Sequence, residues 1–471
     1  MESILLGLAL VFGVYMAWSI GANDVANAMG TSVGSGALTL KRAVIIAAIL
    51  EFSGAFLVGT HVSETVRKGI ISPDIFASQP LFLVYGMMGA LLAAGLWLQV
   101  ASYFGWPVST THSIVGSVLG FGVVVGGMEA ANWGKVAEIV SSWVVSPILS
   151  GTIAFIVFSV IRKKIFFSNA PVKAAKKLTP YLVFFVFLIL TLVLVFKGLK
   201  NLNLDLSFST ALMVACGVGI CASFISKILV SKIKIEFQPD RKIQFQPSKV
   251  LPSINKAIRN LKLANKSATG EIKGKIKNLK EDLEAVSITV NKGQEIELGK
   301  SEFKTVERIF VYLQILSAAF VAFAHGANDV ANAVGPLAAV ISVLQSGVVA
   351  LKSEVPMWVL ALGGVGIVLG LATWGWRVIE TIGKKITELT PTRGFAAEFA
   401  AATTIVLASK LGLPISTTHT LVGAVLGVGL ARGIGALNLR TVRDIVISWI
   451  VTIPIGAILA IIFFYIFKAI F

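Results

Sequence analysis

An acidic, amide-rich motif occurs twice in this chain. The sequence GANDVANA occupies residues 21–28 and returns unchanged at residues 326–333, an offset of 305 positions. On a helix, the aspartate and the two asparagines of each copy share one face, while the residues between them point away. Hard oxygen donors of this kind suit a hard cation, and a single acid per copy favours Na⁺ over Ca²⁺ or Mg²⁺. The predicted sodium ligands are Asn23, Asp24 and Asn27 in the first copy and Asn328, Asp329 and Asn332 in the second. The alternative is a polar patch that joins helices through carboxamide hydrogen bonds.

A second motif, rich in hydroxyl groups, is also duplicated. The sequence PVSTTHSIVG at residues 107–116 returns as PISTTHTLVG at residues 414–423, an offset of 307. Its proline breaks a helix, and a helix that restarts at Ser109 or Ser416 would present backbone N–H groups, hydroxyls and the positive end of its dipole. That combination favours an anion. The candidate anion ligands are Ser109, Thr110, Thr111, Ser113, Ser416, Thr417, Thr418 and Thr420.

Neither copy of the hydroxyl motif contains Lys or Arg. A bound oxyanion would therefore be held by neutral donors and by cations bound nearby, which predicts obligatory cation coupling. The alternative is that Ser, Thr and Gly only permit close helix packing. His112 and His419 fit a packing or hydrogen-bonding role better than direct contact with a substrate.

Three further polar residues lie in apolar segments. Glu51 and Glu398 are predicted to be functional, because a carboxylate at the bilayer centre costs about 2.5–3.5 kcal/mol and needs compensation. Gln99 lies just before the first hydroxyl motif, and Val406 stands at the equivalent position of the second half.

The elements that position these motifs are those of an all-α membrane protein. Of 471 residues, 56% are hydrophobic and 14% are charged, with a mean hydropathy of +0.85. Soluble domains contain about 45–50% apolar and 25% charged residues, so soluble repeat arrays, disordered chains and disulfide scaffolds are excluded. About twelve transmembrane or re-entrant segments are expected, starting near Ile4, Ala43, Leu81, Trp106, Val136, Tyr181, Leu206, Ile309, Met357, Phe395, Leu413 and Val442.

The order and spacing of the motifs indicate a duplicated unit of five segments. A Ser-Trp pair at 142–143 and 448–449 closes each unit. Seven segments separate the two starts, and an odd number reverses orientation, so an inverted repeat is predicted. The expected organisation is a first transmembrane repeat at 1–161, two additional spans at 162–230, a basic cytoplasmic helical loop at 231–308, and a second, inverted repeat at 309–471.

The charge pattern predicts orientation. The central insertion holds 17 Lys/Arg and 10 Asp/Glu. Its apolar residues recur at helical spacing, which predicts an amphipathic helical hairpin. This hairpin is either a pair of solvated helices or a segment with a regulatory or dimerisation role. Outside it, 16 basic residues fall on the side of the insertion against 8 on the other side. The positive-inside rule then places both termini outside and the central loop in the cytoplasm. The net charge of +17 therefore describes orientation rather than a nucleic-acid partner.

With GANDVANA twice and P-[VI]-S-T-T-H-[ST] twice, in that order around a basic loop, the chain resembles the PiT family of inorganic phosphate transporters. The resemblance implies a cation-coupled phosphate symporter, using Na⁺ or in some cases H⁺, and a possible homodimer. It implies cation sites at Asn23, Asp24, Asn328 and Asp329, and a phosphate site at the Ser and Thr residues of both hydroxyl motifs. Glu51 and Glu398 resemble the family's functional acids. The family also includes sulfate carriers.

The sequence thus predicts a secondary active transporter of the plasma membrane, not an enzyme. It would import inorganic phosphate with Na⁺ by alternating access around a midplane site in the lipid bilayer, without an organic cofactor. The alternatives are an H⁺-coupled phosphate or sulfate transporter, an anion channel, and an intramembrane hydrolase built on Ser109, His112 and Asp24.

Overall fold

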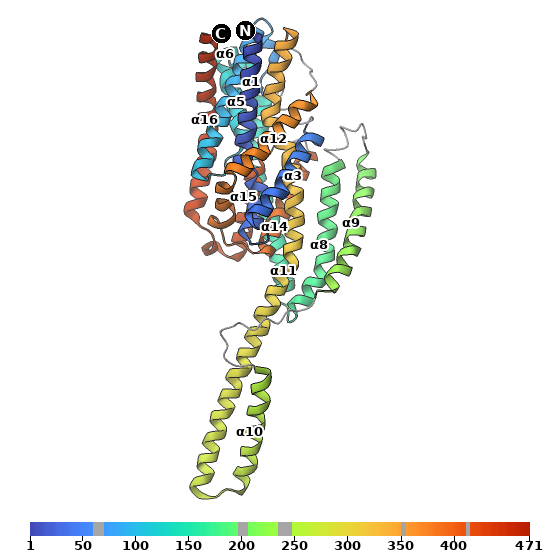
Figure 1. The fold of residues 1–471 in the computed structure, drawn as a ribbon, viewed down its shortest axis with the longest axis vertical. Helices are drawn as coiled ribbons and strands as arrows, with labels where there is room; N and C mark the ends of the chain where they lie inside the picture. The colour runs from blue at the N-terminus through green and yellow to red at the C-terminus, as the bar shows by residue number, and fades with distance from the viewer. Residues whose placement is uncertain (60–69, 196–205, 234–246, 350–354, 411–414) are drawn as a thin grey trace.

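The computed structural model describes residues 1–59, 70–195, 206–233, 247–349, 355–410 and 415–471. Across these ranges the regular structure is helical and contains no strand, apart from an isolated bridge between Ile71 and Ala131. The helices form one long bundle with a thin hairpin projecting from one end (Figure 1).

The helices of the first half are α1 (Glu2–Asn23), α2 (Ala26–Gly34), α3 (Leu40–Val58), α5 (Pro80–Phe104), α6 (Thr110–Gly126), α7 (Trp133–Ile161), α8 (Pro171–Val193) and α9 (Phe208–Ser231). Those of the second half are α10 (Pro247–Ser267), α11 (Gly270–Ser346), α12 (Met357–Trp374), α13 (Trp376–Glu380), α14 (Pro391–Lys410), α15 (Thr417–Arg432) and α16 (Leu439–Ile470). Short 3-10 or π turns lie at Pro73–Phe76, Met128–Ala130, Arg162–Phe166, Thr381–Lys385 and Ile434–Ala436.

In the described ranges, eight helices are long and apolar enough to cross a bilayer. They are Glu2–Gly34, Pro80–Phe104, Trp133–Phe166, Pro171–Leu192, Phe208–Ser231, Glu302–Ser346, Met357–Trp374 and Leu439–Ile470. An all-α integral membrane protein is thereby confirmed. The other four predicted segments correspond to α3, α6, α14 and α15: α6 and α15 have only 17 and 16 residues, and α3 and α14 contain charged residues. The predicted start at Leu413 lies outside the described residues.

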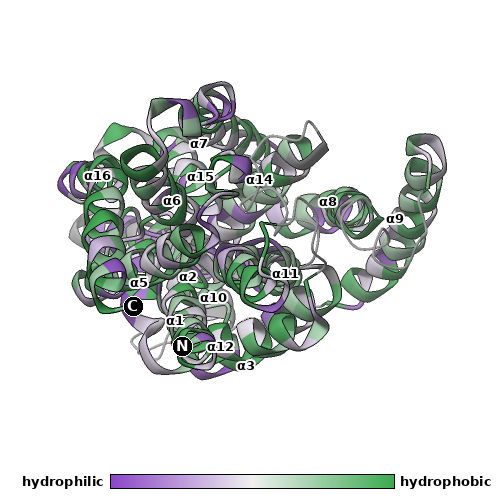
Figure 2. Ribbon diagram, turned by 90° about the horizontal axis from the view of Figure 1, so that it is seen from above, coloured by the Kyte–Doolittle hydropathy of each residue, from purple (hydrophilic) through white to green (hydrophobic). Residues whose placement is uncertain are grey.

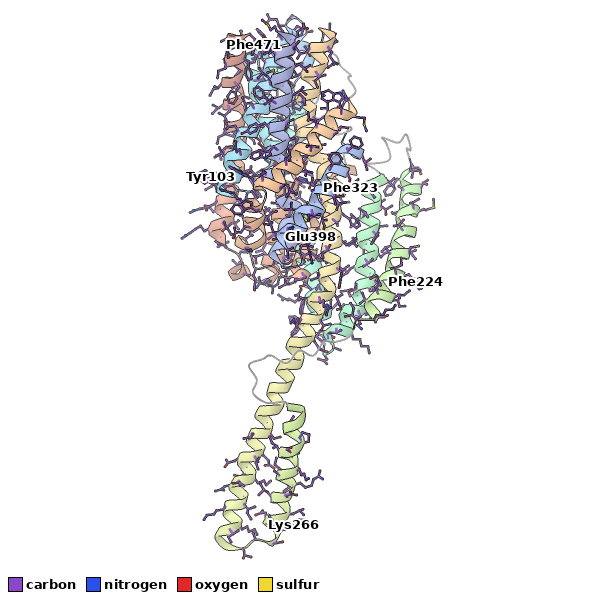
Figure 3. The ribbon with its side chains drawn as sticks, viewed as in Figure 1. Tyr103, Phe224, Lys266, Phe323, Glu398 and Phe471 are labelled. Carbon is purple, nitrogen blue, oxygen red and sulfur yellow. The ribbon has the colours of Figure 1, made fainter. Side chains whose placement is uncertain are left out.

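Two of these shorter helices each pack against the helix that precedes them. α5 packs against α6, and α14 packs against α15. Gly105 ends α5 with φ +68°, a left-handed conformation that suits glycine, and residues 106–109 have no regular secondary structure. Tyr103, near this turn, lies about halfway along the main body (Figure 3). The α5–α6 connection therefore turns inside the apolar region.

The two halves pack crosswise. α1 packs on α12 and α3 packs on α11, while α6 packs on α16 and α7 packs on α15. Glycines allow these close approaches: a Cβ added at Gly423 would fall 2.5 Å from the Cα of Pro147, and one at the equivalent Gly116 would fall 2.8 Å from the carbonyl oxygen of Ile453. Each half is thus buried largely against the other half.

Both termini lie at one end of the bundle, and α10 projects from the other (Figure 1). α10 packs against the first part of α11, and Gly270 at φ +63° ends the turn between them, so the predicted helical hairpin is confirmed. α11 then continues unbroken for 77 residues, across the predicted domain boundary at 308/309 and into the second acidic motif. Its apolar part runs toward the end where the termini lie, and α1 runs away from that end (Figure 1).

Candidate functional site

The four motif copies meet at one buried point. The Asp24 carboxylate accepts hydrogen bonds from Thr110 Oγ1 at 2.6 Å, Thr418 Oγ1 at 2.8 Å and Asn27 Nδ2 at 3.0 Å. Thr110 begins α6 and Thr418 lies in the first turn of α15. One carboxylate of the first acidic motif is therefore held by the hydroxyl motifs of both halves.

The second acidic motif makes the matching contacts. Asp329 accepts from Thr417 Oγ1 at 3.3 Å and from Asn328 Nδ2 at 2.7 Å. Asn332 Nδ2 donates to Thr110 Oγ1 at 3.1 Å and to Thr111 Oγ1 at 3.3 Å.

A further pair shows the pseudo-symmetry of the site. Asn27 Nδ2 donates to Thr418 Oγ1 at 2.9 Å. In the repeat, Asn332 is equivalent to Asn27 and Thr111 to Thr418, and Asn332 donates to Thr111 in the same way. The two halves thus contribute the same residue types to one centre, related by exchange of the halves.

Local structure differs between the two acidic motifs. The sequence predicted one continuous helix for the first copy, but α1 ends at Asn23 and α2 begins only at Ala26. The N–H of Asn27 donates to the carbonyl of Asp24 at 2.8 Å, a tightened turn that directs Asp24 toward the hydroxyl motifs. The second copy lies inside the unbroken α11.

The centre is closed to solvent and rich in oxygen. Asp24 and Asp329 are each 1% exposed. Among the described residues, no donor reaches the buried Oδ1 of Asn27. A buried carbonyl oxygen needs a hydrogen-bond donor or a cation, and these oxygen ligands are of the type that fits a hard cation.

His325 is a buried residue of this centre that the sequence analysis did not predict. Its Nε2 lies 2.8 Å from Asp329 Oδ2, and its Nδ1 lies 2.9 Å from both carboxylate oxygens of Glu51. Ligand atoms of Asp24, His325 and Asp329 all lie within 4.8 Å of one another. His325 immediately precedes the second acidic motif, one helical turn before Asp329, whereas Ile20 stands in that place in the first half. This difference between the two copies of the repeat was the signal in the sequence that could have identified His325.

The first glycine of the motif explains how Glu51 reaches His325. A Cβ at Gly326 would fall 2.7 Å from the Cα of Glu51, so only glycine lets α3 and α11 approach this closely. Glu51 is fully buried and reaches Asp329 of the second acidic motif only through His325, and its predicted functional role stays a prediction.

Glu398 lies in a separate cluster. From α14, its carboxylate accepts from Thr31 at 2.5 Å and Ser32 at 2.8 Å, both on α2, and from Gln314 at 3.3 Å and Ser317 on α11. Figure 3 places it nearer the α10 end of the bundle than Tyr103. Every close donor is neutral, so the charge of Glu398 is compensated by hydrogen bonds alone.

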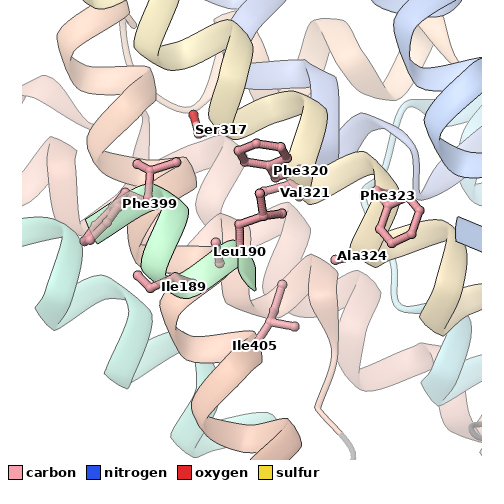
Figure 4. Close-up of a pocket in the computed structure, with 11 residues that line it drawn as sticks. Ile189, Leu190, Ser317, Phe320, Val321, Phe323, Ala324, Phe399 and Ile405 are labelled. Atoms are coloured by element: carbon pink, nitrogen blue, oxygen red, sulfur yellow. The ribbon is translucent and has the colours of Figure 1, made fainter. Parts of the chain in front are cut away.

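A small apolar cavity of about 30 Å³ adjoins this cluster (Figure 4). Ser317 is the only polar residue among those that line it, and Phe320, Phe399 and Ile405 are among the others. Apolar cavities of this kind stay dry. It therefore offers no path for a hydrated ion toward Glu398.

The remaining predicted residues position the hairpins rather than join the centre. Ser109 and Ser416 cap α6 and α15 as predicted, each accepting from the N–H of the histidine three residues on at 3.2 Å. Asn23 holds the α5–α6 connection, donating to Ser102 Oγ and the Trp106 carbonyl at 3.0 Å and accepting from the Val108 N–H at 3.1 Å.

Three predicted polar side chains are engaged elsewhere. The Thr420 hydroxyl donates to the Ser416 carbonyl at 2.8 Å, and that of Ser113 to the Ala94 carbonyl at 3.5 Å. Gln99 accepts from the Tyr15 hydroxyl. None of these contacts belongs to the four-motif centre. Pro414, the first residue of the second hydroxyl motif, lies outside the described residues.

The two motif histidines pack between the hairpins. The rings of His112 and His419 meet edge to face with centroids 4.4 Å apart. Each also packs on a tryptophan of the Ser-Trp pairs, His112 on Trp143 at 3.8 Å and His419 on Trp449 at 3.6 Å. This matches the packing role expected for them.

An ion-pair cluster joins α14 and α15 at the end of the bundle from which α10 projects. Glu388 lies 3.3 Å from Arg393 on α14 and 3.0 Å from Arg432 on α15. The guanidinium of Arg393, followed by that of Arg432, lowers the pKa of the Glu388 carboxyl below its ordinary value of 4.5. The two ion pairs connect the start of α14 to the end of α15 through Glu388.

Comparison with known proteins finds relatives that match almost the whole chain. Residues 20–460 match the model of the phosphate transporter family PHO4. The chain is 49% identical to the chloroplastic inorganic phosphate transporter 2-1 of Arabidopsis thaliana over 465 residues, covering 98% of this chain and 72% of that protein. It is 44% identical to a putative phosphate permease of Chlamydia trachomatis, covering 99% of each.

A solved structure described as the sodium-dependent phosphate transporter superposes with a TM-score of 0.79 at 38% identity, covering 99% of this chain and 100% of that one. The family resemblance of the motifs is therefore confirmed, and the enzyme alternative is excluded, because the relatives are transporters. This chain belongs to the phosphate transporter family of integral membrane proteins.

Proposed function

We propose that this protein is a secondary active symporter that imports inorganic phosphate with Na⁺. The observation that carries the proposal is the contact of Asp24 with Thr110 and Thr418, which belong to opposite halves of the chain. A carboxylate placed there responds to any movement of one half against the other. Inverted repeats that rock around such a centre give alternating access.

The charges of the centre support coupling. Asp24 and Asp329 bring two buried carboxylates within 4.8 Å of each other, with His325 beside Asp329 and the hydroxyl motifs contributing only neutral hydroxyls. A phosphate brought to Thr110, Thr111, Thr417 and Thr418 would add negative charge to this centre. Cations at Asp24 and Asp329 would offset it, so phosphate and Na⁺ would bind together.

Asn27 supports the choice of cation at the first site. Its unpaired oxygen and the Asp24 carboxylate give a hard oxygen set with one acid, which suits Na⁺ better than a divalent ion. The structural relative described as sodium-dependent, 38% identical over nearly the whole chain, agrees with this choice.

A second candidate, H⁺ coupling, is favoured by His325. An imidazole between Glu51 and Asp329 occupies the place where the second half would otherwise hold a cation. Histidine is the side chain whose ordinary charge change falls between pH 5 and 8. A proton on His325 would then replace one Na⁺.

Uptake of labelled phosphate into proteoliposomes tests the proposal. An inward Na⁺ gradient, an inward H⁺ gradient and no gradient are compared at equal ionic strength. We expect accumulation above the external concentration with the Na⁺ gradient, and no reduction by excess sulfate. Uptake that merely equilibrates under every gradient would indicate a channel, and accumulation under the H⁺ gradient alone would select the second candidate.

A further inference from the structure

A large apolar groove opens beside the main body, away from the four-motif centre. It holds about 880 Å³ and lies between α8, α9 and α11. Its walls include Val183 and Phe187 from α8, Val218 and Ala222 from α9, and Leu313 and Leu316 from α11. Seen from above, α8 and α9 stand off from the bundle as a separate pair (Figure 2).

The packing of α9 leaves this groove open. α8 packs along α9 and also contacts α11 and α14, whereas the extensive contacts of α9 are with α8. α9 is therefore joined to the body through α8, and the groove between α9 and α11 is bounded by apolar side chains on both sides. In a membrane such a space is filled by lipid chains or by another protein.

The helix ends beyond one end of the groove are rich in lysine, although none of these lysines is among the lining residues. α8 carries Lys173, Lys176 and Lys177 in its first two turns, and α9 ends with Lys227 in its last turns and Lys232 at its C-cap. Neither helix contains an Asp or Glu. All five lysines belong to the helix ends on the α10 side of the bundle (Figure 1).

Two contacts define this basic end further. Lys176 Nζ donates to the carbonyls of Ser231 at 3.1 Å and of Ile233 at 2.5 Å, and Ile233 itself lines the groove. The nearest turn of α11 carries Glu307, whose carboxylate instead accepts from the Thr392 N–H at 2.8 Å and its hydroxyl at 2.9 Å. The carboxylate of Glu307 is thus held by α14 rather than by these lysines.

We propose that the groove binds a phospholipid with an anionic head group, its acyl chains between α9 and α11 and its head group at Lys173, Lys177, Lys227 and Lys232. Basic pockets between transmembrane helices on the cytoplasmic side are the sites that take such head groups. The lysine stems extend along the apolar helices and place the ammonium groups at the lipid surface. The lipid fastens the α8–α9 pair to α11, the helix that carries Asp329.

Native mass spectrometry of the full chain in mild detergent tests this. The protein is mixed with equal amounts of phosphatidylglycerol and phosphatidylcholine that have identical chains. We expect phosphatidylglycerol to be retained at least about tenfold better, since tenfold corresponds to about 1.4 kcal/mol. The variant K173Q/K177Q/K227Q/K232Q is expected to lose this preference, and Ala222→Phe, which fills the groove, to lose both lipids.

Matched controls separate the site from general effects. The variant K256Q/K262Q/K266Q/K273Q removes four positive charges from the α10–α11 hairpin, and Phe224→Ala changes a 65% exposed side chain of α9 that does not line the groove. Both are expected to retain the preference. If the quadruple groove variant does not purify as a single species, K173Q/K177Q is measured in its place.

The contrary outcomes are distinct. Equal retention of the two lipids by the unmodified protein overturns the proposal, as does an unchanged preference in the lysine variant. If Ala222→Phe leaves lipid retention unchanged but converts a dimer into monomers, the groove is occupied by a second copy of the chain instead.

Discussion

Asp24 and Asp329 are the residues on which transport is expected to depend most. Each is 1% exposed, and their ligand atoms lie within 4.8 Å. Two unit charges at that separation repel by about 3–4 kcal/mol at an effective dielectric constant of about 20. Neutral Thr and Asn donors reduce this cost, and a bound cation or a proton in the centre removes it. The arrangement is therefore stable when positive charge is present.

The first prediction concerns these two carboxylates. Asp24→Asn and Asp329→Asn are each expected to lower Na⁺-driven phosphate uptake by more than about tenfold, because the carboxamide keeps the shape and loses the charge that holds the cation. Uptake in proteoliposomes is the measurement. Asp74→Asn changes an exposed acid within the short turn at Pro73–Phe76; it is the control and should transport normally. Unchanged Na⁺ dependence in both centre variants would refute the cation assignment.

The second prediction concerns the link between His325 and Glu51. His325→Gln and Glu51→Gln each break the same pair, whose atoms lie 2.9 Å apart. Each is expected to reduce uptake about tenfold or more, and the double variant to lose little beyond either single one, because residues in one network are not additive. Uptake by all four proteins completes the cycle. Additive losses would show that the two residues act independently.

At the scale of helices, small residues decide how closely the halves approach. α6 crosses α16 at Gly116, and α15 crosses α7 at Gly423, which are equivalent positions of the repeat. These crossings hold the first turns of α6 and α15, where Thr110 and Thr418 contact Asp24. The distance between the packed helices therefore also sets the positions of the threonines that contact Asp24.

The third prediction tests such a crossing. Gly423→Val is expected to destabilise the protein by about 1–3 kcal/mol, as overpacking does, because its Cβ would lie 2.5 Å from the Cα of Pro147. A lower thermal unfolding midpoint in detergent is the measurement. Gly435→Val makes the same change where no heavy atom lies within 4 Å, and its midpoint should stay near that of the unmodified protein. Equal midpoints for both variants would contradict the packing argument.

At the scale of the whole molecule, the two ends of the bundle are unlike. The termini lie at one end, and the basic α10–α11 hairpin projects from the other (Figure 1). The lysines of α8 and α9 and the Glu388 cluster belong to the hairpin end. The positive-inside rule assigns that end to the cytoplasm.

The fourth prediction tests this orientation. With Cys216 and Cys221 replaced by serine, a single cysteine is introduced by Gly274→Cys in the hairpin or by Glu2→Cys at the N-terminus. A membrane-impermeant maleimide applied to intact cells should label the second variant and spare the first, and permeabilised cells should show both labelled. The reverse pattern would invert the assigned topology.

The sequence by itself determined the class of protein and the chemistry of its centre. Composition indicated a helical membrane protein, and the duplicated motifs named Asp24, Asp329 and the threonines around them. The class was confirmed because membrane burial leaves a signal in local sequence. The repeat pointed to the site residues for the same reason, and their roles stay predictions. The breaks before Ser109 and Ser416 were predictable for the same reason, since proline acts on its own neighbours.

Only the tertiary structure decided which side chains meet. Asn27 contacts Thr418 across 391 positions, and His325 contacts Glu51 across 274. The hydroxyls of Ser113 and Thr420 donate to the backbone carbonyls of Ala94 and Ser416, although their motifs suggested that they would bind an anion. Such choices depend on the angle and distance at which helices cross, which the glycines at positions 326 and 423 permit but which no local pattern specifies.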